Sequence, residues 1–108
     1  MKLTAIFLLC STLGLLAQKA SWYGDELAGR PMANGKPFDP SKLTAASWHF
    51  PLGTRVRVTH GGKSVDVTIT DRGPHRRFKD REIDLSRAAF QKLAPLDKGL
   101  LSGTVSPL

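Results

Sequence analysis

The sequence predicts a small, mainly β barrel with one short helix. Apolar and polar residues alternate on both sides of a glycine pair, and other short apolar runs are separated by turns rich in Gly, Pro, Asn and Asp. Many short strands with a single helix in a chain of 108 residues are typical of a small barrel rather than of a layered α/β fold.

The glycine pair, Gly61-Gly62, marks the clearest element. Val56 and Val58 alternate with polar residues before the pair, and Val65, Val67 and Ile69 do so after it. Two period-two runs around two glycines predict a β-hairpin closed by a tight turn.

Weaker signals predict the remaining elements. Short strands are expected at residues 21–24, 43–46, 83–85 and 103–105. Turn-forming residues at 25–42 predict a long ordered loop, and such loops often carry function. Ser86 is a suitable N-cap for a helix over 87–94, which Pro95 would end.

The first 17 residues have the features of a secretory signal peptide. Lys2 supplies a positive charge, residues 3–16 are mostly apolar and uncharged, and Ala17 precedes a plausible cleavage point. The apolar run is short for a membrane span, so we expect no transmembrane anchor. The expected result is export to the periplasm or cell envelope, with a mature domain over 18–108. The alternative is a buried N-terminal helix.

Cysteine content and charge restrict the partners. Cys10 is the only cysteine and lies in the expected signal, so the mature domain would hold no disulfide. Leu9 stands where a lipidation signal has a small residue, which argues against a lipid anchor at Cys10. The net charge of +7 becomes +6 without Lys2 (7 − 1) and favours anionic partners. Such partners are nucleic acid, acidic lipid or the carboxylates of peptidoglycan stem peptides, and export argues against nucleic acid; alternatively, the charge serves solubility alone.

Seven short motifs in order resemble the rare lipoprotein A family, bacterial septal-ring lytic transglycosylases. They are ASWYG at 20–24, ANG at 33–35, FD at 38–39, LTAA at 43–46, LGTRVRVT at 52–59, DRGP at 71–74 and IDLS at 83–86. The resemblance implies a six-stranded double-psi β-barrel. The last motif also resembles, more distantly, the acidic motif of expansins.

The resemblance implies cleavage of the bond between N-acetylmuramic acid and N-acetylglucosamine in peptidoglycan glycan strands. The muramic acid's own 6-hydroxyl replaces water and leaves a 1,6-anhydro end. One carboxyl that starts protonated can act first as the acid and then as the base. We expect a monomer that needs no cofactor.

Asp71 and Asp84 are the candidate catalytic residues. Asp71 has the parity of Val65, Val67 and Ile69, so a straight strand would turn it toward the apolar side and Arg72 away from it. The alternative for Asp71 is a structural role in accepting backbone N–H bonds. Asp84 lies two residues before the helix N-cap, where it could instead stabilise the start of the helix.

Two positions depart from the family pattern. Lys36 stands where the motif has glutamate, and Ser47 stands where it has histidine. His49 would share a face with Ser47 in an extended segment and is a candidate replacement for the imidazole. The alternative is an ordinary surface histidine.

Further residues are candidates for substrate binding. Tyr23 and Trp48 could stack on sugar rings, although core packing is the alternative for them and for Trp22. Basic side chains that could meet acidic groups, or form a solvated loop, are Arg72, His75, Arg76 and Arg77. The histidines are dispersed without zinc-ligand spacing, so no metal site is expected.

Three functions follow from this sequence. The first is a minimal lytic transglycosylase that acts through Asp71 with help from Asp84. The second is a glycan-binding module of the cell envelope that does not cleave, because Lys36 and Ser47 replace two expected groups. The third is a basic exported protein that binds its partners by charge.

Overall fold

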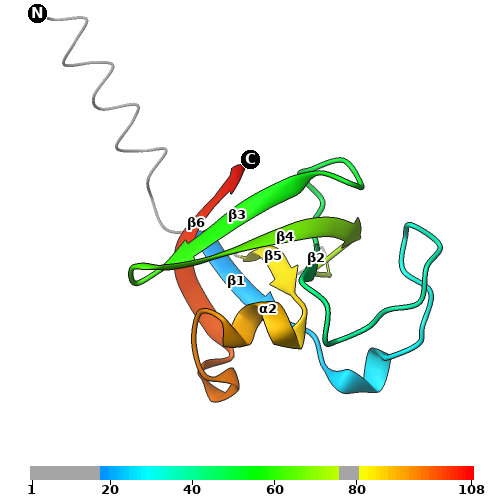
Figure 1. The fold of residues 1–108 in the computed structure, drawn as a ribbon, viewed down its shortest axis with the longest axis horizontal. Helices are drawn as coiled ribbons and strands as arrows, with labels where there is room; N and C mark the ends of the chain where they lie inside the picture. Colours follow the sequence, from blue (N-terminus) through cyan, green and yellow to red (C-terminus); the bar gives the residue numbers. More distant parts are fainter. Residues whose placement is uncertain (1–17, 76–80) are drawn as a thin grey trace, which may run out of the picture.

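Six strands close into a barrel in the order β1-β5-β2-β4-β3-β6 (Figure 1). The structure is a computed structural model that describes residues 18–75 and 81–108. The strands are β1 (Gln18–Trp22), β2 (Thr44–Ala46), β3 (Arg55–His60), β4 (Lys63–Asp71), β5 (Arg81–Leu85) and β6 (Leu100–Pro107). The helical elements are the 3₁₀ turns η1 (Asp25–Leu27) and η2 (Leu96–Lys98) and the helix α2 (Arg87–Gln91). The predicted mainly β, six-stranded barrel with one short helix is therefore confirmed.

The barrel mixes parallel and antiparallel neighbours. β1 pairs with β5, and β2 with β4, in parallel, whereas the other four pairings are antiparallel. The short strand β2 lies between β4 and β5. Because β4 and β5 both pair with β2, the register of these two pairings sets which residues of β4 and β5 lie on either side of the same β2 residue.

β3 and β4 form the predicted hairpin. Val56 pairs with Val67 and Val58 with Val65, and all four valines are buried. The turn glycines have φ values of 54° and 82°, and a two-residue type I′ turn needs such positive values at both positions.

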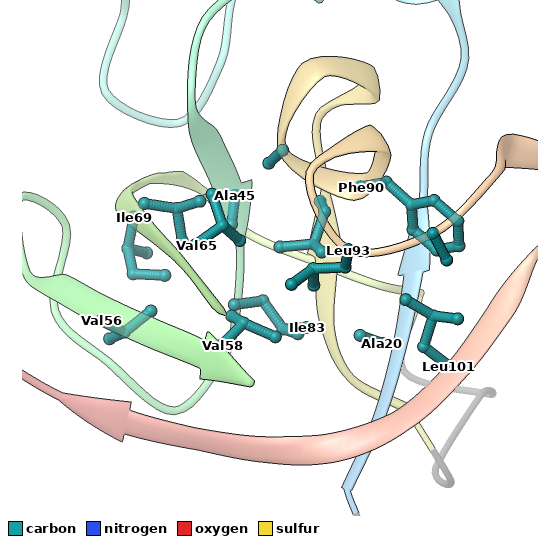
Figure 2. Packing of buried hydrophobic residues seen from close by; sticks show 14 residues of the cluster. Ala20, Ala45, Val56, Val58, Val65, Ile69, Ile83, Phe90, Leu93 and Leu101 are labelled. Carbon is teal, nitrogen blue, oxygen red and sulfur yellow. The ribbon is translucent and has the colours of Figure 1, made fainter. Parts of the chain in front are cut away.

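The barrel interior is a continuous apolar core. Figure 2 shows 14 residues of this cluster converging from the strands and from α2. Phe90 of α2 is fully buried, and its ring lies 6.2 Å from that of Trp22. The helix therefore packs its apolar side against the barrel, with contacts to β1, β4 and β5.

Ser86 caps α2 as predicted and also ties a distant loop to it. Its hydroxyl accepts a hydrogen bond from Ala89 N at 3.3 Å and donates one to Lys42 O at 2.6 Å. The helix ends at Gln91 rather than at residue 94. Before Pro95 the chain continues in a tighter 3₁₀-type turn, in which a backbone N–H donates to the carbonyl three residues earlier, as from Leu93 N to Phe90 O.

The segment between β1 and β2 is an ordered loop, as predicted. Phe38 is buried, and its backbone N–H donates to Arg30 O while its carbonyl accepts from Gly29 N. The ring of Tyr23 packs on Phe38 at a centroid distance of 4.4 Å. One apolar side chain thus anchors a polar loop to the barrel.

All four predicted short strands have somewhat different bounds in the structure, and the first and last differ most. The strand expected at 21–24 is Gln18–Trp22, because β1 pairs with β6 from Gln18 opposite Gly103. The closing strand β6 is longer than expected for the same reason. A Cβ on Gly103 would overlap the carbonyl oxygen of Thr59, so the backbones approach closely here.

The expected signal peptide lies outside the described residues. Within residues 18–75 and 81–108, no helix has the length and apolar character needed to cross a lipid bilayer.

Candidate functional site

Asp71 and Asp84 lie on two strands that flank Ala46 of β2. The Cα of Ala46 is the register partner of both aspartates, so they lie on opposite sides of one residue. Strand spacing alone places their Cα atoms about 10 Å apart. Because Ala46 carries only a methyl group, a cleft of about 140 Å³ opens between the two aspartates.

The cleft brings together five of the seven predicted site residues. It is lined by Tyr23, Leu27, Ala46, Asp71, Arg72, Gly73, Pro74, His75 and Asp84. Trp48 and His49 do not line it.

Asp84 is partly buried in this cleft. Loss of hydration raises the pKa of its carboxyl from 3.8 to about 6. A hydrogen bond from Ser21 Oγ to Asp84 Oδ1, at 3.0 Å, opposes that rise, as does the positive charge of Arg81. The negative charge of Asp71 adds a smaller increase. A carboxyl with this pKa can both give and take a proton near neutral pH.

Asp71 has a different environment. Its Oδ1 accepts two backbone hydrogen bonds, from Ala33 N and Arg72 N, each at 2.8 Å. Asp71 therefore fixes the loop 31–37 on the end of β4, which is the structural role considered as the alternative. The same carboxylate also lines the cleft.

The end of β4 does not run straight, contrary to the expectation. Ala45 pairs with Ile69, whereas Ala46 pairs with Asp71, so Thr70 is an extra residue in a β-bulge. Thr70 is buried although alternation would turn it outward, and Asp71 is only partly buried. The bulge, rather than simple parity, places Asp71 in the cleft.

The hydroxyl of Tyr23 is buried and has no hydrogen-bond partner among the described residues. Burial raises the pKa of this phenol, and the negative charges of Asp71 and Asp84 raise it further. The Thr44 hydroxyl lies close enough to offset part of this rise, although the two hydroxyls do not meet in hydrogen-bonding geometry. Because buried polar groups are normally paired, this hydroxyl is suited to a ligand oxygen.

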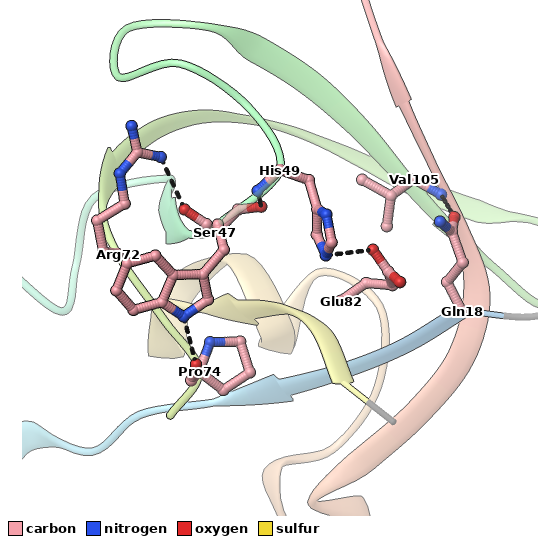
Figure 3. Close-up of polar contacts among 8 residues, drawn as sticks. Gln18, Ser47, His49, Arg72, Pro74, Glu82 and Val105 are labelled. Atoms are coloured by element: carbon pink, nitrogen blue, oxygen red, sulfur yellow. Dashed lines mark hydrogen bonds and ion pairs between the residues drawn. The ribbon is translucent and has the colours of Figure 1, made fainter. Parts of the chain in front are cut away.

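Arg72 organises the segment after β2. Its Nη1 donates to Ser47 O at 2.8 Å (Figure 3). The same Nη1 donates to Phe50 O at 2.6 Å. Arg72 was expected to point away from Asp71, yet both residues line the cleft. Its guanidinium thus holds the rim of the cleft in place.

Ser47 and His49 do not share a face. Ser47 is fully buried, and its Oγ accepts from His49 N at 3.0 Å, which turns the chain. His49 is exposed and lies beside Glu82, with Nε2 3.1 Å from Oε2 (Figure 3). The expectation of a straight extended segment is wrong here, and His49 lies outside the cleft.

Trp48 and His75 lie at the rim of the cleft. Trp48 is 43% exposed, and its Nε1 donates to Pro74 O at 2.7 Å. His75 is exposed and lines the cleft. Arg76 and Arg77 lie outside the described residues.

Sequence reasoning missed Ser21 and Ala46 as site residues. Ser21 is the register partner of Asp84 across β1 and β5, and Ala46 faces both aspartates. Ser21 and Ala46 both appear in the sequence motifs, but only the pairing of strands that are distant in the sequence shows that they lie beside the aspartates.

A larger groove of about 670 Å³ lies beyond the loop 31–37. It is lined by Met32, Asn34, Lys36, Pro37, Asp39, Lys42, Thr44, Leu52, Gly53, Thr68, Ile69 and Thr70. Among residues 18–75 and 81–108, no cluster of three or more His, Cys, Asp or Glu side chains could hold a metal ion.

Comparison with known proteins points to one family. Residues 16–105 match the family described as lytic transglycolase. Endolytic peptidoglycan transglycosylase RlpA of Pseudomonas aeruginosa is 48% identical over 82 residues, which are 74% of this chain and 24% of that protein. The chain thus spans about a quarter of the length of this relative.

Two solved structures share the fold. The Streptomyces papain inhibitor is 30% identical with a TM-score of 0.63, covering 85% of this chain and 93% of that one. An expansin of Clavibacter michiganensis, in complex with cellohexaose, has a TM-score of 0.67 at 17% identity, over 86% of this chain and 50% of that one. At this identity the expansin supports only a shared fold. That shared fold agrees with the distant resemblance to expansins expected from the sequence. The chain belongs to the lytic transglycolase family of double-psi β-barrel domains.

Proposed function

We propose that this protein cleaves peptidoglycan glycan strands between N-acetylmuramic acid and N-acetylglucosamine and leaves 1,6-anhydro ends. The observation that carries the proposal is the Asp84 carboxyl, whose pKa is raised to about 6, in a cleft shared with Asp71. The names of relatives such as the Pseudomonas aeruginosa transglycosylase support the same reaction class.

In the proposed mechanism Asp84 carries the proton. Its protonated carboxyl donates to the glycosidic oxygen as the bond from that oxygen to C1 of muramic acid breaks. The resulting carboxylate takes the proton of the 6-hydroxyl as O6 bonds to C1. The enzyme regains its starting state, and no water is consumed.

Asp71 and Tyr23 assist in this scheme. The Asp71 carboxylate stabilises the positive charge that develops on the sugar ring, as in an oxocarbenium-like transition state. The buried Tyr23 hydroxyl donates a hydrogen bond to a sugar oxygen. Proton transfer, the role first expected of Asp71, is here assigned to Asp84 because burial raises the pKa of the Asp84 carboxyl to about 6.

The location follows from the expected signal peptide at residues 1–17. An exported monomer would meet glycan strands in the periplasm or cell envelope.

Digestion of purified sacculi tests the proposal. We expect the wild-type protein to release 1,6-anhydro muropeptides, identified by mass spectrometry, and Asp84→Asn to release none. Asp66→Asn is the matched control, because Asp66 lies on the outside of the barrel in a bidentate pair with Arg57. If the wild-type protein releases no anhydro product, the enzymatic proposal fails.

The second candidate is a module that binds glycan without cleaving it. Lys36 replaces the expected glutamate, and Ser47, which replaces the expected histidine, is fully buried against His49 N. Co-sedimentation with sacculi in the absence of any anhydro product would favour this function. A papain-inhibition assay on the same preparation tests the activity for which the Streptomyces protein is named.

A further inference from the structure

The cleft between the two aspartates is small compared with the ligand it is proposed to bind. Its volume is about 140 Å³, which is roughly the volume of five water molecules in the liquid. A space of this size has room for one sugar ring, whereas the bond to be broken joins two. A glycan strand bound in the cleft must therefore place the neighbouring sugar against the rim.

Trp48 is a large aromatic side chain at this rim. It is 43% exposed, whereas the other exposed large apolar side chains of residues 18–75 and 81–108 are all leucines. The second tryptophan, Trp22, is different, because it packs against the core beside Phe90 and donates from Nε1 to Leu96 O at 3.0 Å. Within the described part of the chain, the core cluster does not include Trp48. The barrel therefore does not use the Trp48 ring to build its core.

The Trp48 side chain is attached to the segment that closes the cleft. Its Nε1 donates to Pro74 O at 2.7 Å, and Pro74 lines the cleft. Two bonds fix the preceding residue, from Ser47 N to Asp71 O at 3.1 Å and from Arg72 Nη1 to Ser47 O at 2.8 Å. A ring that is already held in place loses little conformational freedom when a ligand stacks on it, and this favours binding.

The chemistry of the Trp48 ring suits a sugar. The indole N–H already donates to the Pro74 carbonyl, so the ring surface is what this side chain offers to a ligand. The faces of pyranose rings carry C–H groups, whose slight positive charge complements the negative face of an aromatic ring. An apolar ring surface at the end of a polar cleft therefore matches a sugar that continues a bound strand.

We infer that Trp48 is a stacking platform for the sugar next to the one in the cleft, and that it extends the site along the glycan strand beyond Pro74. This inference rests on the proposed function only in that the cleft binds glycan, and it holds whether or not the bond is then cleaved. In this role Trp48 binds the strand and takes no part in proton transfer.

Binding of peptide-free glycan strands tests the inference. The strands are released from purified sacculi and freed of stem peptides, and every protein carries Asp84→Asn so that the strands stay intact. We expect Trp48→Ala to reduce affinity roughly two- to tenfold, as for the loss of an aromatic stacking contact. Trp48→Phe keeps a ring without the indole N–H and should retain most of the affinity.

Tryptophan emission gives a second readout of the same contact. Binding of the strands should shift the emission spectrum of the protein that retains Trp48. Trp48→Phe should abolish this shift, because the remaining tryptophan, Trp22, packs against the core.

A matched variant separates stacking from general apolar attraction. Leu108 is 59% exposed and does not line the cleft, so Leu108→Ala should leave the affinity unchanged. Unchanged affinity of Trp48→Ala would overturn the inference. So would an equal loss with Trp48→Phe and Trp48→Ala, because the bond to Pro74 rather than the ring would then be what matters. Either result leaves glycan binding intact, whereas strands that bind none of the proteins would contradict the proposed function and the inference with it.

Discussion

Replacing Asp84 with asparagine should stabilise the protein at neutral pH while it removes activity. In the folded protein the Asp84 carboxyl has a pKa of about 6, against a usual value of 3.8. This difference corresponds to ~3 kcal/mol, an upper limit to what the buried charge costs the folded state above pH 6. Asparagine keeps the shape and an acceptor for Ser21 but never carries the charge.

The sign of the effect depends on pH. At about pH 3, below the usual pKa of 3.8, the carboxyl is protonated in both the folded and the unfolded protein and costs nothing, and the penalty grows as the pH rises from there to about 6 and is constant above it. Urea unfolding followed by tryptophan fluorescence, at about pH 8 and about pH 3, measures both limits. We expect a gain of up to about 3 kcal/mol for Asp84→Asn at the higher pH and almost none at the lower pH.

Asp66→Asn provides a control of opposite sign. The side chain of Arg57 lowers the pKa of Asp66, so the charged form favours folding and its removal should slightly destabilise the protein at the higher pH. If Asp84→Asn destabilises the protein at about pH 8, or stabilises it equally at both pH values, the raised pKa of Asp84 is refuted.

Three other changes test the site and the barrel. Ser21→Ala removes the donor to Asp84 and should move the alkaline limb of the pH–activity profile upward by about one pH unit; no shift would contradict the assigned contact. Tyr23→Phe should leave the free energy of unfolding unchanged or higher, because its hydroxyl has no partner among the described residues, yet lower kcat/KM on glycan strands; unchanged kinetics would exclude a role for the hydroxyl. Gly103→Ala should destabilise the barrel by about 1–3 kcal/mol in urea unfolding, because its Cβ would overlap Thr59 O, and an unaffected midpoint would show that the strands can separate there.

Local patterns explain why some of the fold was predictable. The hairpin at Gly61-Gly62 depends on alternation and on two glycines next to each other, so the sequence contains all of its determinants. The Ser86 cap is similarly local. The bounds of β1 and β6 are not determined locally, because Gln18 becomes part of a strand only by pairing with Gly103.

The sequence motifs contain the two aspartates of the candidate site but not the surroundings of their carboxyls. Asp71 and Asp84 stood out in the motifs, whereas the bulge at Thr70 and the burial around Asp84 depend on the pairing and packing of distant strands. The expectation of an extended segment from Ser47 to His49 did not include the hydrogen bond from His49 N to the Ser47 hydroxyl, which turns the chain there. The bulge and the burial arise from tertiary contacts, which alternation and propensity do not encode.

The shared pairing of Ala46 has a consequence for how this barrel can change in evolution. Because one backbone residue sets the offset between Asp71 and Asp84, their spacing belongs to the sheet and not to any side chain. The Lys36 side chain is exposed on the loop between β1 and β2, so a change of this side chain leaves the pairing of Ala46 as it is. A substitution at Ala46 itself would fill the space between the aspartates. The spacing of the two carboxyl-bearing strands and the side chains of the loop can thus change independently in this fold.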